Sequence, residues 1–252
     1  MRSLALALTI AALPALAGQP LAYTEGGTKL AGYLALPAAT AGKVPGVVVV
    51  HQWMGLTDHE RKVSDDLAKL GYVALAADIY GEGVHPKDTA EAGKTAGIYK
   101  GDRALYRRRV QAALDTLKAQ KGVDPSRLAV IGFCFGGAGA LEAARAGMPV
   151  KGVVTFHGSL DVPEGYTPGP IAAKILVCHG ADDPFVTPKI VADFQDEMRK
   201  SKADYVFIAY ANAVHSFTQK EAGNDNSKGA AYNEAAQRRS WQHMKDFFKE
   251  IF

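Results

Sequence analysis

Residues 132–137 read G-F-C-F-G-G and place a cysteine between two aromatic residues and two glycines. An apolar run precedes Cys134 and small residues follow it, which predicts a strand, a sharp turn and a helix. In a nucleophile elbow of this kind, side chains two positions before and after the nucleophile would collide, so Gly132 and Gly136 suit the turn. The helix N-terminus also favours the thiolate. The motif therefore predicts that Cys134 is a nucleophile.

A nucleophilic thiol needs a base and a group that orients the base. Asp182 and Asp183 follow a later apolar run and His215 follows the next one, which is the chain order expected for acid and histidine. His215 would move the proton, and a carboxylate would hold its tautomer and stabilise its cation. We favour Asp183, which begins a D-P-F-V segment, and keep Asp182 as the alternative. The backbone N–H groups of Phe135 and Trp53 are the expected oxyanion donors.

The elements that must position these residues alternate between strands and helices. Buried strands are predicted at 44–52, 72–79, 127–133, 150–158, 173–180 and 204–210. Such alternation implies parallel pairing within one α/β domain, which we expect to cover residues 18–252. Functional groups in such sheets gather at the carboxyl ends of the strands. Residues 81–101 read as a loop with a short helix.

The first 17 residues carry the features of a secretory signal peptide. Arg2 precedes a short apolar run at 4–13, and Ala15-Leu16-Ala17 forms an A-x-A cleavage pattern. We expect cleavage between Ala17 and Gly18, and therefore a periplasmic or secreted protein. The alternative is a buried N-terminal helix.

Composition narrows the class of partner. The 252 residues are 48% apolar, with 29 basic and 26 acidic side chains, which suits one sizeable core. Such a balance does not indicate a nucleic acid or a membrane as partner. We expect a monomer that binds a small-molecule substrate. The basic run at 107–109 reads as a solvated helix face, and Cys178 as a buried core thiol that is not paired with Cys134.

Further histidines follow predicted strands but lack the spacing of metal ligands. His51, His157 and His179 read as hydrogen-bonded framework residues, so no metal and no cofactor is expected. His59, on a helix with a predicted capping box at 57–60, is expected to face solvent.

Five segments together resemble the dienelactone hydrolase family of α/β-hydrolases. They are H-Q-W-M-G at 51–55, G-Y-V-A-L-A-A-D-I-Y-G at 71–81, G-F-C-F-G-G at 132–137, G-A-D-D-P-F-V at 180–186 and H-S-F at 215–217. The resemblance implies an α/β-hydrolase fold, with a mostly parallel central sheet and helices on both faces. It also implies a triad of Cys134, Asp183 and His215 that hydrolyses a lactone or ester through an acyl-thiol intermediate, without metal or cofactor.

The chain departs from the family pattern around the predicted pocket. Members that act on dienelactone carry a glutamate where Gln52 stands, and arginines for the substrate carboxylate where Glu82 and Gln219 stand. An amide cannot take the thiol proton, and Glu and Gln do not pair with a carboxylate. We therefore expect a different substrate: a small neutral or aromatic ester, lactone or thioester. Tyr80 and Phe133 are read either as part of an aromatic pocket wall or as core.

A second class of function stays open on the sequence alone. The chain could be a non-catalytic α/β-hydrolase-fold protein that binds a ligand or senses oxidation through Cys134. Gln52 and an oxidising compartment, in which a thiolate forms sulfenic acid, favour this alternative. The complete set of triad residues favours the hydrolase.

Overall fold

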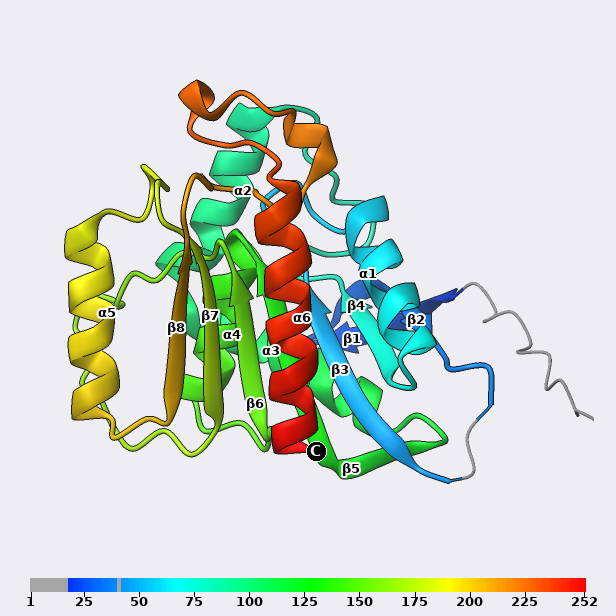
Figure 1. The fold of residues 1–252 in the computed structure, drawn as a ribbon. Coiled ribbons are helices and arrows are strands. Elements are labelled where there is room, and N and C mark those ends of the chain that lie inside the picture. The colour runs from blue at the N-terminus through cyan, green and yellow to red at the C-terminus, as the bar shows by residue number, and fades with distance from the viewer. Residues whose placement is uncertain (1–17, 40–41) are drawn as a thin grey trace, which may run out of the picture.

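The computed structural model describes residues 18–39 and 42–252, and it contains one eight-stranded sheet (Figure 1). The strand order is β1-β2-β4-β3-β5-β6-β7-β8. The strands are β1 (Gln19–Glu25), β2 (Thr28–Ala35), β3 (Val44–Val50), β4 (Val73–Ala77), β5 (Val123–Phe133), β6 (Gly152–Phe156), β7 (Lys174–Gly180) and β8 (Tyr205–Tyr210). All neighbours from β4 to β8 pair in parallel, which confirms the predicted fold class. The predicted signal peptide lies outside the described residues.

Helices cover both faces of the sheet. They are α1 (Asp58–Lys69), α2 (Thr89–Gly101), α3 (Arg103–Lys118), α4 (Phe135–Arg145), α5 (Pro188–Lys200) and α6 (Glu234–Ile251). Alternate side chains of β5 point to opposite faces, so Ile131 packs with α1 and α6 while Val130 packs with α3 and α4. Among the described residues, no helix is long and apolar enough to cross a membrane.

Two elements differ from the sequence-based expectation. The antiparallel hairpin of β1 and β2 extends the sheet next to β4, and no strand was predicted there. Helix α2 has 13 residues, in place of a short helix within a loop. Asp88 caps its N-terminus, but its buried side chains are only Ala92, Ala96 and Tyr99. Because two of these are small, the helix lacks the wide apolar stripe that sequence patterns reveal.

Both cysteines are free thiols, as predicted. Strand β6 lies between the strands that end near Cys134 and Cys178, which keeps the two apart. Cys178 is fully buried and its sulfur accepts a hydrogen bond from the Tyr210 hydroxyl at 3.5 Å. Burial raises the pKa of the Cys178 thiol to about 12, which makes this sulfur a poor nucleophile.

Candidate active site

Cys134 occupies a strained turn between β5 and α4. Its backbone has φ 53° and ψ −115°, a conformation that costs energy for a residue with a side chain. A Cβ on Gly132 would lie 1.9 Å from the Gly136 carbonyl oxygen, and a Cβ on Gly136 would lie 2.2 Å from the Val50 carbonyl oxygen. Only glycine fits at either position. The turn therefore presents the thiol at the carboxyl edge of the sheet.

Replacing Gly136 with alanine is expected to destabilise the fold, because the added methyl group meets backbone that cannot move away. Overpacking of this kind costs about 1–3 kcal/mol, which for a domain of this size is a fall in Tm of roughly 2–12 °C. Thermal unfolding followed by circular dichroism measures the change. Gly93→Ala on α2 is the matched control, since its Cβ would meet nothing and its Tm should stay level or rise. An unchanged Tm for Gly136→Ala would contradict this description of the elbow.

His215 and Asp183 form a buried pair beside the elbow. The His215 Nδ1 and the Asp183 Oδ2 are 2.7 Å apart. The other carboxylate oxygen, Oδ1, accepts the backbone N–H groups of Phe185 at 2.9 Å and Val186 at 3.3 Å, so the carboxylate is fixed at both ends. Asp182 is exposed. The structure thus brings Asp183, and not Asp182, to the imidazole.

The thiol of Cys134 and the imidazole of His215 shift each other's pKa. Burial raises the pKa of the thiol, but the charge and hydrogen bond of His215, the N–H of Phe135 and the charge of Lys100 together lower it below its usual value. Burial lowers the pKa of His215, but the charge of Cys134 and the hydrogen bonds that the ring donates to Asp183 and Cys134 raise it to about 10. Each charged form stabilises the other, so the site favours a thiolate paired with an imidazolium over the neutral pair.

His215→Asn is expected to slow the alkylation of Cys134 by iodoacetamide at neutral pH by roughly tenfold or more. The variant removes the cation that lowers the thiol pKa but keeps the burial that raises it, so the rate profile moves to higher pH. His243→Asn on α6 is the control, since this imidazole contacts Tyr210 instead. Rates of alkylation measured across pH, with Cys178→Ala as background, provide the comparison. If the alkylation rates of wild type and His215→Asn depend on pH in the same way, the description of Cys134 and His215 as an ion pair is contradicted.

The loop after β3 is held by buried polar contacts close to the thiol. The hydroxyl of Tyr80 donates to the Trp53 carbonyl oxygen at 2.8 Å. His51 Nε2 accepts the Ile79 N–H at 3.2 Å, so its Nδ1 carries the proton and donates to the Gln52 carbonyl oxygen at 2.6 Å. His51 is therefore a framework residue that fixes the loop on which the expected oxyanion donor Trp53 lies.

The other predicted pocket residues lie in different surroundings. Gln52 is half-buried and Glu82 is exposed. Gln219 is buried, and its Nε2 has no hydrogen-bond partner among the described residues. The ring of Phe133 is stacked on Phe156 with 4.9 Å between centroids, on the face of the sheet that α1 and α6 cover. The structure therefore places Phe133 in the core of that face.

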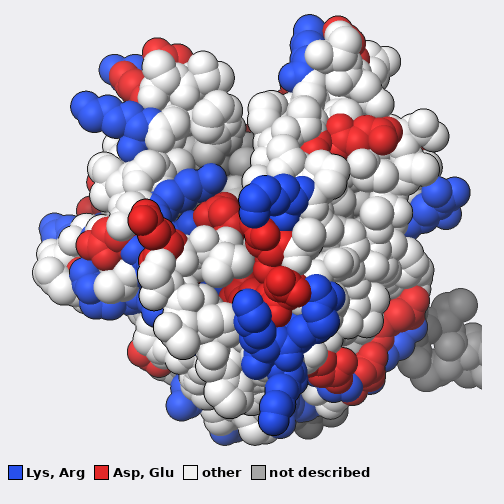
Figure 2. Space-filling model, turned by 90° about the vertical axis from the view of Figure 1, so that its left-hand side faces the viewer, with Lys and Arg blue, Asp and Glu red and all other residues white. Residues whose placement is uncertain are grey.

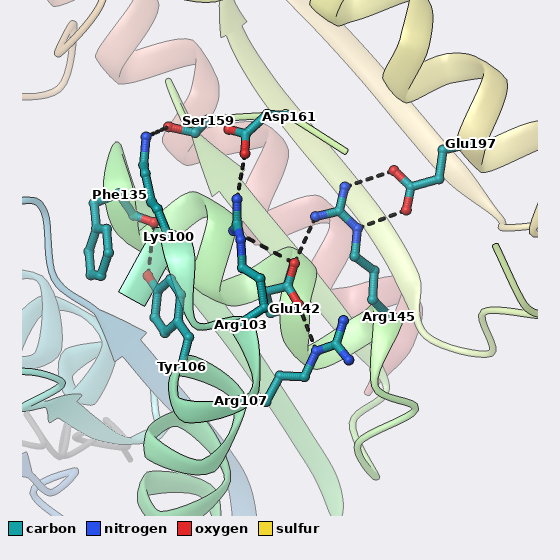
Figure 3. Close-up of polar contacts among 10 residues, drawn as sticks. All are labelled: Lys100, Arg103, Tyr106, Arg107, Phe135, Glu142, Arg145, Ser159, Asp161 and Glu197. Atoms are coloured by element: carbon teal, nitrogen blue, oxygen red, sulfur yellow. Dashed lines mark hydrogen bonds and ion pairs between the residues drawn. The ribbon is translucent and has the colours of Figure 1, made fainter. Parts of the chain in front are cut away.

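A second loop, which the sequence analysis did not single out, also holds the elbow. The Cys134 N–H donates to the Phe156 carbonyl oxygen at 3.1 Å, and the Cys134 carbonyl oxygen accepts the Ser159 N–H at 3.2 Å. The Ser159 hydroxyl in turn accepts a hydrogen bond from Lys100 of α2 at 3.1 Å (Figure 3). Because α2 was expected to be mostly loop, no sequence signal pointed to Lys100.

Helix α4, which begins just after Cys134, is anchored by buried ion pairs (Figure 3). Glu142 is fully buried and accepts hydrogen bonds from Arg107 at 2.7 Å and Arg145 at 3.0 Å. Arg145 also makes a two-pronged contact with Glu197 of α5, at 2.7 Å for each bond. Arg109 is buried as well and Arg107 is half-buried, so of the solvated face predicted at 107–109 only Arg108 is exposed. These pairs fix α4 against α3 and α5.

Charges on the outer surface are mixed in sign. On the end of the molecule shown in Figure 2, basic and acidic side chains lie next to one another, and neither sign forms a large patch of its own. Within residues 18–39 and 42–252, no group of three or more His, Cys, Asp and Glu side chains is placed to hold a metal ion.

A mostly parallel sheet with a nucleophile-elbow turn after β5, and an aspartate and a histidine after β7 and β8, is the architecture of an α/β-hydrolase. The sequence profile of the Dienelactone hydrolase family matches residues 30–252, and the chain belongs to that family. It is a hydrolase that acts on esters or lactones.

Two relatives illustrate the likeness. A dienelactone hydrolase-like promiscuous phosphotriesterase, P91, from metagenomic libraries has a crystal structure that is 44% identical with a TM-score of 0.89, covering 94% of this chain and 99% of that chain. A probable 2-oxo-3-(5-oxofuran-2-ylidene)propanoate lactonase from Bradyrhizobium sp is 33% identical over 204 residues, which are 77% of this chain and 81% of that protein.

Proposed function

We propose that the protein hydrolyses small ester, lactone or thioester substrates with Cys134 as nucleophile, His215 as general acid and base, and Asp183 as the residue that orients His215. One observation carries the proposal: the thiol on the strained elbow and the imidazole of His215 lie close enough for each to shift the pKa of the other, and the Nδ1 of that imidazole lies 2.7 Å from a buried carboxylate. Cysteine nucleophiles are activated in this way, by a neighbouring base that a third group orients. No other thiol in the described residues has such partners.

In the acylation half, the Cys134 sulfur attacks the substrate carbonyl carbon and the carbonyl π electrons move to oxygen. The N–H groups of Phe135 and Trp53 would bind this oxyanion. As the tetrahedral intermediate collapses, the bond to the leaving oxygen breaks, and the imidazolium of His215 gives that oxygen a proton. The products are an alcohol and an acyl thioester on Cys134, with His215 neutral.

In the deacylation half, neutral His215 removes a proton from water, and the resulting hydroxide attacks the thioester carbon. The second tetrahedral intermediate expels the Cys134 thiolate and releases the carboxylic acid. His215 is again an imidazolium, which restores the starting ion pair. Asp183 stabilises the imidazolium throughout and keeps its Nε2 turned toward the reacting atoms.

Three side chains at positions of the family pocket favour neutral substrates over dienelactone. Glu82 and Gln219 cannot pair with a substrate carboxylate, and Gln52 cannot accept the thiol proton. The likeness to P91 adds phosphotriesters as a second candidate class, because the same thiolate could attack phosphorus and the same N–H groups could bind the phosphoryl oxygen.

A substrate panel tests this proposal. p-Nitrophenyl acetate and butyrate, dihydrocoumarin, an acyl thioester and paraoxon are assayed in reductant with wild type and Cys134→Ala. We expect turnover of the neutral esters or the lactone that depends on Cys134. Rates equal to those of Cys134→Ala across the whole panel would overturn the proposal and favour the alternative, a non-catalytic protein that binds a ligand or senses oxidation.

We also propose that the protein is exported to the periplasm or secreted as a monomer. The basic residue, apolar run and A-x-A pattern within residues 1–17 support export. N-terminal sequencing of the mature protein from a periplasmic fraction should begin at Gly18, and light scattering should give the mass of one chain. An uncut protein confined to the cytoplasm would contradict export, and a dimer mass would contradict the monomer.

A further inference from the structure

The described residues form a cavity of about 490 Å³ between α1 and α6, on the sheet face opposite α3 and α4. In Figure 1 both helices lie on the near side of the sheet. None of Cys134, Asp183 and His215 lines it. Pockets of roughly 300–1,000 Å³ hold small molecules, so the cavity is large enough for a ligand of its own.

Aromatic rings form much of the wall of this cavity. They belong to Phe133, Phe156, Tyr232 and Trp241, together with the imidazole of His59. His59 packs edge-on against Phe133 with 4.9 Å between centroids, so the expectation that it faces solvent was wrong. Its Nε2 is buried and has no hydrogen-bond partner among the described residues. The apolar part of the cavity wall is therefore mainly aromatic.

The charges around the cavity favour a cation. Its charged lining side chains are Asp58, Asp66, Glu221, Glu234, Lys62 and Lys220. Lys62 is paired with Asp66, whereas neither Glu221 nor Glu234 has an ion-pair partner among the described residues. The Nζ of Lys220 lies 5.9 Å from the centre of the Tyr232 ring, so one aromatic wall already holds a cation. Lys220 has no carboxylate partner among the described residues either, so the three unpaired side chains leave the lining with one net negative charge, which favours a cation over an anion.

One wall of the cavity is linked to the imidazole of His215. Thr218, a lining residue, has its Oγ1 2.8 Å from the Nε2 of His157. His157 is fully buried with φ 39°, and its ring centroid lies 5.2 Å from that of His215. Burial and the charges of His215 and His59 hold the pKa of His157 well below its usual value, so it is neutral. A single neutral side chain thus separates Thr218 from His215.

We propose that the α1–α6 cavity binds a small aromatic molecule carrying a protonated amine. We also propose that binding there changes the protonation of His215 through Thr218 and His157. The ring packs among the aromatic walls, and the ammonium lies near the carboxylates of Glu221 and Glu234. The ligand and the imidazolium of His215 carry like charges, so binding disfavours the imidazolium and with it the thiolate. The link to His215, unlike the binding itself, rests on the function proposed above.

Binding is tested with phenethylamine as the probe. The sequence has two tryptophans, and Trp241 lines the cavity. We expect a saturable change in fluorescence with wild type and with Cys134→Ala, lost in Trp241→Phe and retained in Trp53→Phe. Calorimetry should give an affinity about two- to fivefold weaker for Glu234→Gln, by the loss of one contact with an exposed charge. No saturable binding, or equal binding of the anion phenylacetate, would overturn the site.

The link to His215 is tested by the rate at which iodoacetamide alkylates Cys134. Saturating phenethylamine should slow the reaction by about fivefold in wild type. Thr218→Val keeps the shape of the side chain but removes its hydrogen bond to His157, so the ligand should bind this variant and slow its alkylation less than it does in wild type. Binding without any change of rate in wild type would overturn the link. If Cys134 is alkylated slowly, and at the same rate in wild type and in His215→Asn, the function proposed above is overturned. The binding result is not affected by that outcome.

Discussion

Cys134→Ala is expected to lower kcat/KM for p-nitrophenyl acetate by at least about 10³-fold. The substitution removes the sulfur that forms the acyl intermediate, so the only remaining catalysis comes from the oxyanion donors and from substrate binding. The fold should be retained, because alanine is smaller than cysteine and should adopt the same backbone conformation, with φ 53°, at this position. Steady-state kinetics in reductant, with circular dichroism to show folding, measure the effect.

Cys178→Ala provides a matched control, since it removes the other sulfur of the chain. Cys178 is fully buried and its raised pKa keeps it a neutral thiol. We expect this variant to keep wild-type kcat/KM, with a small fall in Tm for the lost packing. A full loss of activity in Cys178→Ala, with Cys134→Ala active, would reverse the assignment of the nucleophile.

Asp183→Asn is expected to reduce kcat by about 10⁴-fold, in line with the loss of the orienting aspartate in other triads. The Asp183 Oδ2 lies 2.7 Å from His215 Nδ1, where the carboxylate accepts a hydrogen bond from the ring and stabilises the imidazolium. An amide can offer an N–H at that position, which favours the wrong tautomer. The carboxylate also raises the His215 pKa, so the variant should lose the imidazolium at a lower pH. Kinetics across pH test both effects.

Asp182→Asn is the neighbouring control, with the same change of charge one residue away. Asp182 is exposed, and the hydrogen bond at this position is made by its backbone N–H to Ala213. Its activity should remain within about twofold of wild type, as expected for an exposed charge. If Asp182→Asn and Asp183→Asn lose comparable activity, the two aspartates act through the charge that they give the loop. The contact of Asp183 with His215 would then not explain the effect.

The candidate site was largely predictable from the sequence because its parts are local. Gly132 and Gly136 mark the elbow around Cys134, and the strand that ends before each of Asp183 and His215 is a clear apolar run. The choice between Asp182 and Asp183 needed the structure. Both follow the same strand, and only the fold of the loop decides which carboxylate turns inward.

What the sequence could not predict depends on contacts between distant segments. Helix α2 buries only two alanines and one tyrosine, so its apolar pattern is too weak to predict a helix. Because the helix was not predicted, the contact of Lys100 with Ser159 could not be predicted either. The burial of Arg109 depends on Glu25 in the N-terminal hairpin, 2.8 Å away and far along the chain. His59 could not be placed against Phe133 before the packing of α1 on β5 was known.

The measurement that tests the central claim most directly is mass spectrometry of the protein quenched during turnover of p-nitrophenyl acetate. Deacylation can be slowed at low pH, where His215 stays protonated and cannot activate water. We predict one acetyl group per chain, located on the peptide that contains Cys134 and absent from Cys134→Ala. Turnover with no acyl group on Cys134, or with an acyl group on another residue, would contradict the account.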